Sequence, residues 1–175
     1  MGYALSSLGN LPVQDEIDLY IFVVGSSWKD ETYEAIENNF MELAKRIGPK
    51  AVIAKGFEPE AWSSQVCNRY LGKDVETLYD VFPALLITDT HPEKLTEASM
   101  RLLVPLRDAQ KRFGGTASFF EALSDFARTK NPAFLQKFET KESLGSKAWS
   151  VLELKPNFFG FGLNLKELVA RAQGK

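Results

Sequence analysis

Two hydroxyls, an indole and an ammonium follow one another in Ser26, Ser27, Trp28 and Lys29. The apolar run before them, IDLYIFVV at residues 17–24, predicts a strand buried on both faces. Ligands of open α/β sheets bind beyond the carboxyl ends of such strands. Amides at a helix start could hold an anion or a carboxylate, with Lys29 as counter-charge and Trp28 as a stacking face. The alternative is a capped helix with an interface tryptophan.

A second group combines cations with a glycine turn at the start of a predicted helix. Cations, flexible backbone and a helix N-terminus are the ingredients of a phosphate site. The pattern is not a P-loop, because no Gly-Lys-Ser/Thr ending follows. The alternative is a solvated basic face beside an ordinary helix cap, with Thr116 as the N-cap. The group consists of Arg107, Lys111, Arg112, Gly114, Gly115 and Thr116.

The segment PNFFGFGLNL, residues 156–165, places large apolar side chains on a backbone that glycines allow to bend. We predict that Phe158, Phe159 and Phe161 either complete the core of the domain or dock onto a protein partner.

The reactive side chains are few, because the chain has one cysteine, Cys67, and one histidine, His91. No internal disulfide or Cys-rich metal site can form, so we expect no metal and no cofactor. The spacing of Val66 and its neighbours places Cys67 within a helix, where a buried, inert thiol is expected. His91 lies in a turn-like tetrapeptide, and a Cys–His pair would need the two side chains within hydrogen-bond reach.

Length and composition predict one globular domain. The chain has 175 residues, of which 45% are hydrophobic and 25% charged, so two large domains and a disordered chain are excluded. No apolar run is long enough to span a membrane, and we expect a cytoplasmic protein. Residues 1–90 carry 7 basic against 14 acidic side chains and residues 91–175 carry 14 against 9. The imbalance could join the two halves or attract an anionic partner, but the net charge of −2 makes nucleic acid an unfavourable one.

The order of elements predicts an α/β fold. Residues 1–14 lack periodicity and are expected to form a flexible arm. Residues 15–130 read as strand, helix, strand, helix, strand, strand, helix, and residues 131–175 as an extension packed on this core. That extension is predicted to contain a strand near Trp149 and a helix that begins near Asn164.

This order, with Pro83 at the head of the strand in VFPALLITD, resembles the thioredoxin fold. The resemblance implies a mixed sheet flanked by helices, in which residues 17–24 and 84–88 are neighbours and Pro83 follows a cis bond. It adds Pro83 to the candidate site beside Ser26 to Lys29. Thioredoxins carry Cys-x-x-Cys at the end of the first core strand, whereas this chain has no cysteine there. Dithiol redox activity is therefore not expected.

The segment IFVVGSSWKDE also resembles the opening of TIR domains, some of which cleave NAD with a glutamate on a later helix. Glu58 and Glu60 match no such motif, and the TIR resemblance would require a parallel sheet. We therefore predict a non-redox binding or scaffold module that acts through a protein partner or a small anionic ligand. The alternative is an enzyme, either a TIR-like NAD hydrolase or a glutathione-dependent transferase with Ser26 or Ser27 beside the substrate thiol.

Overall fold

The structure, a computed structural model, describes residues 1–25, 31–138 and 152–153. These residues form a mixed α/β domain whose six-stranded sheet has the order β1-β3-β2-β4-β5-β6. The strands are β1 (Gly2–Leu5), β2 (Leu19–Val24), β3 (Ala51–Gly56), β4 (Ala84–Thr88), β5 (Arg101–Pro105) and β6 (Leu152–Glu153). The helices are α1 (Glu31–Arg46), α2 (Pro59–Leu71), α3 (Leu106–Phe113), α4 (Thr116–Thr129) and α5 (Ala133–Gln136), with 3₁₀ turns η1 (Leu8–Asn10), η2 (Val75–Val81) and η3 (Pro92–Lys94).

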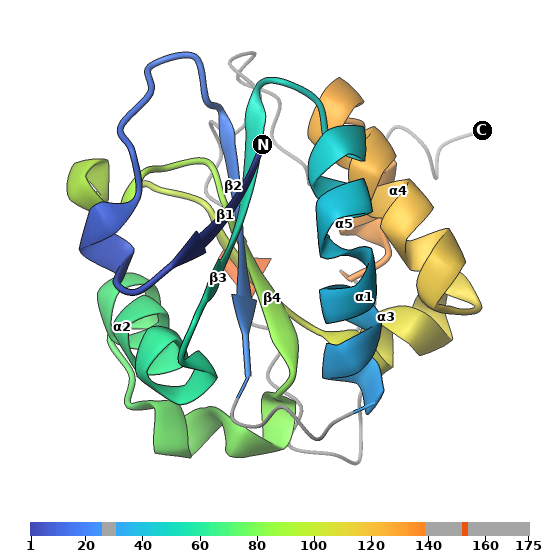
Figure 1. Cartoon of the computed structure of the whole chain (residues 1–175). Coiled ribbons are helices and arrows are strands. Elements are labelled where there is room, and N and C mark those ends of the chain that lie inside the picture. The colour runs from blue at the N-terminus through green and yellow to red at the C-terminus, as the bar shows by residue number, and fades with distance from the viewer. Residues whose placement is uncertain (26–30, 139–151, 154–175) are drawn as a thin grey trace.

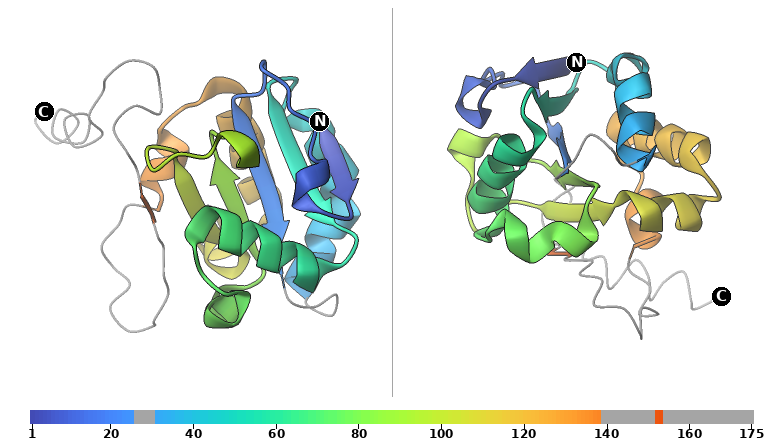
Figure 2. Two further views of the ribbon diagram at one scale, coloured as in Figure 1. Left: turned by 90° about the vertical axis from the view of Figure 1, so that its left-hand side faces the viewer. Right: turned by 60° about the horizontal axis from the view of Figure 1, so that its bottom comes forward.

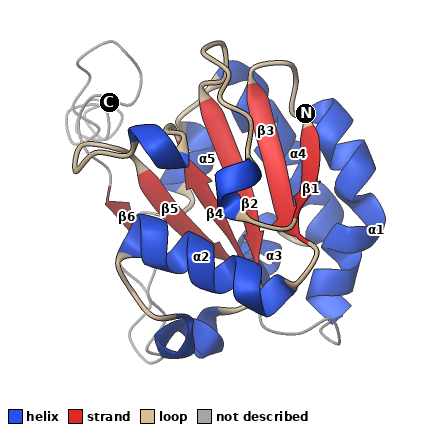
Figure 3. Ribbon diagram, turned by 60° about the vertical axis from the view of Figure 1, so that its left-hand side comes forward, coloured by secondary structure: helices blue, strands red, loops and turns tan. Residues whose placement is uncertain are grey.

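Helices cover both faces of the sheet. In Figure 1, α2 lies on one side of the strands and α1, α3 and α4 on the other, and the right panel of Figure 2 shows the same layers end-on. Strands β1, β3 and β2 are parallel, whereas β4 is antiparallel to both β2 and β5. Figure 3 shows β1 and β6 at opposite edges of the sheet.

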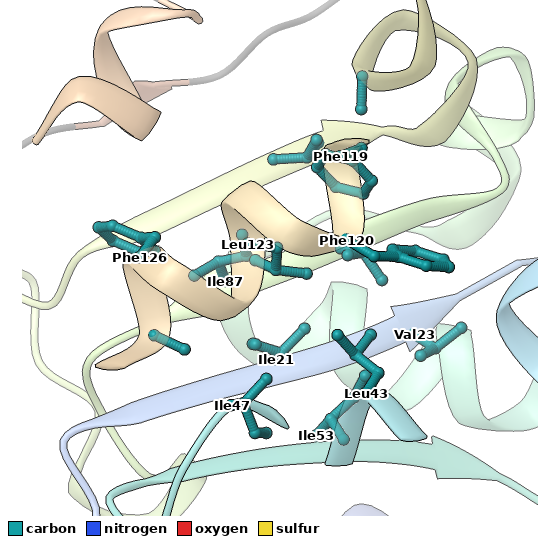
Figure 4. Close-up of a cluster of buried hydrophobic side chains, with 14 of the residues drawn as sticks. Ile21, Val23, Leu43, Ile47, Ile53, Ile87, Phe119, Phe120, Leu123 and Phe126 are labelled. Carbon is teal, nitrogen blue, oxygen red and sulfur yellow. The ribbon is translucent and has the colours of Figure 1, made fainter. Parts of the chain in front are cut away.

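The core is divided by the sheet into two apolar clusters. The central strands β2 and β4 are buried at every residue, as expected of strands covered on both faces. One cluster joins the sheet to α1 and α4, and Figure 4 shows Ile21 and Ile53 of the strands beside Leu43 of α1 and Leu123 of α4. The other cluster joins the opposite face to α2, η1 and η2.

The predicted α/β fold class is confirmed, and the central prediction about strand neighbours is correct. β2 pairs with β4 in antiparallel register, with Tyr20 opposite Thr88 and Val24 opposite Ala84. The Phe82–Pro83 peptide bond that precedes β4 is cis, as the resemblance to the thioredoxin fold implied. In the predicted extension, β6 pairs with β5 at Arg101 and Leu102, while its predicted helix lies outside the described residues.

The structure corrects one prediction and adds one helix. Residues 1–14 are not a flexible arm, because Gly2–Leu5 form β1 and pair with β3 along its length. The strand is short and lies at the edge, so its sequence shows no long apolar run. Residues 106–113, for which we predicted no element, form the helix α3.

Among the described residues, no helix is both long enough and apolar enough to cross a bilayer.

Candidate functional site

The candidate ligand site lies at the carboxyl end of β2 and β3. Gly25 follows β2, Phe57 follows β3, and Pro83 immediately precedes the antiparallel strand β4, so the topology brings these three residues to one end of the sheet. Pro83 is buried, and its carbonyl accepts a hydrogen bond of 2.9 Å from the amide of Leu106. The other predicted residues, Ser26, Ser27, Trp28 and Lys29, lie outside the described part of the chain.

A buried serine of α2 fixes the backbone at the end of β2. The Ser63 hydroxyl accepts a hydrogen bond of 2.8 Å from the amide of Gly25, and its oxygen lies 2.8 Å from the Gly25 carbonyl and 2.6 Å from the Pro59 carbonyl. One residue before, the Trp62 indole donates to the carbonyl of Val23 at 3.0 Å. Because these groups are buried, each lost bond would leave an unsatisfied polar atom. The backbone at the end of β2 is therefore held to α2.

Tyr33, in the first part of α1, also packs against the end of β2. A Cβ atom added to Gly25 would lie 2.9 Å from the ring of Tyr33 and 3.7 Å from Pro83. The three residues are thus packed together, and only a residue without a side chain fits between the tyrosine and the proline. This close packing confirms that Gly25 and Pro83 are neighbours at the site.

Tyr33 begins a polar network beneath the site. Burial, and then the charge of the Glu37 carboxylate, raise the pKa of Tyr33 far above its ordinary value. Glu37 forms an ion pair with the ammonium of Lys55 on β3, which also lies 4.9 Å from the centre of the Phe40 ring. The oxygen Oε1 of Glu37 is buried, with no hydrogen-bond partner among the described residues.

Sequence reasoning missed this network. Tyr33 and Glu37 are four residues apart on one helix, so their spacing predicts a contact. Lys55 is the one charged residue of the strand AVIAKG, which is an unusual place for an unpaired cation. These two signals suggest that Lys55 pairs with a nearby carboxylate. That α1 packs beside β3, which brings Glu37 to Lys55, can be known only from the arrangement of helices and strands.

Two large apolar or aromatic side chains near the site are exposed. The side chain of Phe57 is 60% exposed and that of Tyr79 is 41% exposed. Tyr79 lies on η2, which leads directly into Phe82 and Pro83, and its ring packs edge-on against Phe82 with centroids 6.4 Å apart. Exposed rings of this size at a sheet end are typical of contact surfaces.

The predicted anion group is only partly assembled. Gly114 ends α3 and Gly115 is the N-cap of α4, both with positive φ, so the glycine turn exists. Thr116 is not the N-cap that we expected but the first residue of the helix, and its hydroxyl accepts a hydrogen bond of 2.8 Å from the Gln110 amide. The positive φ of Gly115 explains the difference, because glycine occupies the cap position where threonine would be strained.

The cations of this group differ in their placement. Arg107 and Lys111 are exposed on α3. Arg112 instead turns toward α5, where its guanidinium donates to the Lys137 carbonyl at 2.7 Å and lies 5.8 Å from the centre of the Phe138 ring. Arg112 and Lys137 line a hollow of about 420 Å³. The structure therefore directs Arg112 to α5 rather than to the turn that begins α4, and the anion site stays a prediction.

Both reactive side chains of the chain are buried and engaged in the fold. Burial raises the pKa of the Cys67 thiol to about 11. The His91 ring donates from Nε2 to the Leu11 carbonyl at 3.2 Å and accepts at Nδ1 from the amide of Glu93 at 3.2 Å, where the donor assignment follows from the amide at Nδ1. Cys67 and His91 are therefore structural residues here, as we predicted for the thiol.

The predicted docking residues Phe158, Phe159 and Phe161 lie outside the described residues. Within the described residues, no group of three or more His, Cys, Asp or Glu side chains is arranged to hold a metal ion. Comparison of the chain with protein-family models, with curated proteins and with solved structures finds no match.

Proposed function

We propose that this protein is a non-redox binding module that contacts a protein partner with the carboxyl end of its sheet. The observation that carries the proposal is the state of Cys67. This single thiol is buried in α2 and has a pKa of about 11, so very little thiolate forms at neutral pH. The same end of the sheet presents the exposed rings of Phe57 and Tyr79, which suit contact with a protein surface.

The sheet topology supports the resemblance to the thioredoxin fold over the TIR alternative. A TIR-like sheet would be parallel, whereas β4 and β5 here run antiparallel to their neighbours. In the thioredoxin-like reading, Pro83 flanks the segment where the redox cysteines would lie. The proposal is that this chain uses the corresponding place for binding.

A site-specific crosslinking experiment tests the proposal. A photoreactive phenylalanine analogue replaces Phe57 at the sheet end, and in a matched protein it replaces Met41, which is 66% exposed on α1. We expect protein adducts in cells from position 57 and far fewer from position 41. Equal yields at both positions, or none at position 57, would contradict the proposal.

Two further measurements separate binding from catalysis. The purified protein is incubated with NAD and with glutathione plus an electrophilic conjugation substrate, and we expect no turnover of either. Cys67 is labelled with a disulfide reagent at neutral pH, and we expect at least 100-fold slower labelling in the folded protein than in denaturant. Turnover of NAD or formation of a glutathione conjugate would replace the binding module with an enzyme.

A further inference from the structure

An exposed tyrosine on η2 lies beside two carboxylates. The Tyr79 hydroxyl donates to Oε1 of Glu60 at 3.2 Å, and the pKa of Tyr79 is raised by partial desolvation and then by Glu60 and Glu76. Glu60 comes from the first turn of α2. Glu76 and Tyr79 are three residues apart on a 3₁₀ turn, a spacing at which side chains eclipse and share one face. η2 is the green segment at the bottom of Figure 1.

The ring of Tyr79 is fixed, and part of it stays open to solvent. Phe82 supports it through an edge-on contact with centroids 6.4 Å apart, and Glu60 holds its hydroxyl. The side chain nevertheless keeps 41% of its exposure. A supported aromatic ring with carboxylates at its rim attracts a cation both through the ring quadrupole and through the carboxylate charges.

The stretch of chain that carries this ring is predominantly acidic. Residues 57–82 contain five acidic and two basic side chains. Glu58, Glu60, Glu76 and Asp80 are all exposed. Such a surface repels nucleic acid and acidic peptides and is complementary to a basic segment.

We infer that the η2 surface, defined as Glu60, Glu76, Tyr79 and Asp80, binds a basic segment of the protein partner. A lysine or arginine side chain of that segment lies over the Tyr79 ring, and neighbouring cations meet the carboxylates. The inference rests on the proposed function and names the chemistry of the partner.

Peptide binding to the full chain tests the inference. The probes are fluorescein-labelled peptides of equal length in which arginine, glutamine or glutamate alternates with leucine, and the readout is fluorescence anisotropy at low and high salt. We expect the arginine peptide to bind best and to weaken with salt. Glu60→Gln with Glu76→Gln should weaken its binding about fivefold, and Tyr79→Leu about threefold.

The matched control removes the same charge elsewhere. Glu42→Gln with Glu121→Gln neutralises exposed carboxylates on α1 and α4 and should leave the affinity within about 1.5-fold. An equal loss in this control, an unchanged affinity in Tyr79→Leu, or equal binding of the glutamate peptide would overturn the inference. Sedimentation of the free protein tests whether a second copy of the chain occupies this surface. A dimer that is abolished by Glu60→Gln with Glu76→Gln would identify that copy as the occupant and would also overturn the inference.

The outcomes distinguish this inference from the proposed function. If the amide NMR signals of Gly25 and Tyr33 shift upon addition of the glutamine peptide but not of the arginine peptide, the sheet end binds peptides without a preference for cations. This result would refute the inference and leave the proposed function in place. Turnover of NAD or a glutathione conjugate would refute the proposed function while an arginine-selective surface remained.

Discussion

The two ends of the sheet differ in the contacts that their side chains make. At the amino end of β2, side chains of distant segments are joined across the surface. Asp15 pairs with Lys94 at 2.7 Å and Asp18 with Lys130 at 2.6 Å, and His91 bonds to the Leu11 carbonyl. At the carboxyl end, Ser63 and Trp62 of α2 form hydrogen bonds with the backbone of Gly25 and Val23. The rings of Phe57 and Tyr79 are exposed to solvent there.

The opposite charges of residues 1–90 and residues 91–175 play a different part at each end of the sheet. Both ion pairs at the amino end join an acidic residue of the first half to a basic residue of the second half, as one of our two sequence interpretations required. Exposed pairs of this kind contribute little stability each. At the carboxyl end, the acidic side chains of Glu60, Glu76 and Asp80 are exposed, so the same asymmetry leaves an acidic surface there.

The largest expected effect comes from adding a methyl group at Gly56, where α2 packs tightly against the end of β3. A Cβ atom at Gly56 would lie 2.2 Å from Cβ of Trp62, and Trp62 cannot move without losing its bond to Val23. Gly56→Ala should therefore lower the free energy of unfolding by about 3 kcal/mol, measured by chemical denaturation. Gly9→Ala is the control near the amino end, because its nearest atom would be 3.9 Å away. Equal losses in both variants would contradict the close packing of α2 on β3.

The next effect tests the buried hydroxyl that holds Gly25. Ser63→Ala removes the acceptor of the Gly25 amide and should cost about 2 kcal/mol, because the amide stays buried and unsatisfied. The adjacent Ser64 is exposed, and Ser64→Ala should change stability by less than about 0.5 kcal/mol. Denaturation curves measure both values. If Ser63→Ala lowered the free energy of unfolding no more than Ser64→Ala, the hydrogen bonds of Ser63 would not stabilise the carboxyl end of the sheet.

Sequence patterns predicted the elements better than the site. The helix that we predicted around Cys67 is α2, and local signals set its ends, because proline marks its start and Gly72, with left-handed backbone, its end. β1 was missed because it is held by backbone pairing with β3, which leaves no periodic apolar signal. The network of Tyr33, Glu37 and Lys55 was missed for a related reason, since its members meet only after α1 packs on the sheet.

A smaller effect is expected at the amino end. His91→Phe keeps an aromatic ring against Tyr20, whose ring centre lies 5.7 Å away, but removes the bonds to Leu11 and Glu93. We expect a loss of about 1 kcal/mol. Amide hydrogen exchange should accelerate around Leu11 and stay unchanged at Gly25, because the two lie at opposite ends of the sheet. Acceleration at Gly25 as well would mean that the two ends are coupled.

The smallest effect concerns the exposed pair of Asp15 and Lys94. The hydrogen bond and the charge of Lys94 lower the pKa of Asp15. A lowered carboxyl pKa stabilises the fold above the ordinary range of aspartate and loses this contribution as the pH falls through the lowered value. Lys94→Met should return the pKa of Asp15 to its ordinary value, measured by carboxyl NMR titration, with no measurable change in Tm at neutral pH. Lys45→Met, on α1, should leave that pKa unchanged. A clear fall in Tm in Lys94→Met alone would show that the amino end depends on its surface charges rather than on the buried contacts of His91.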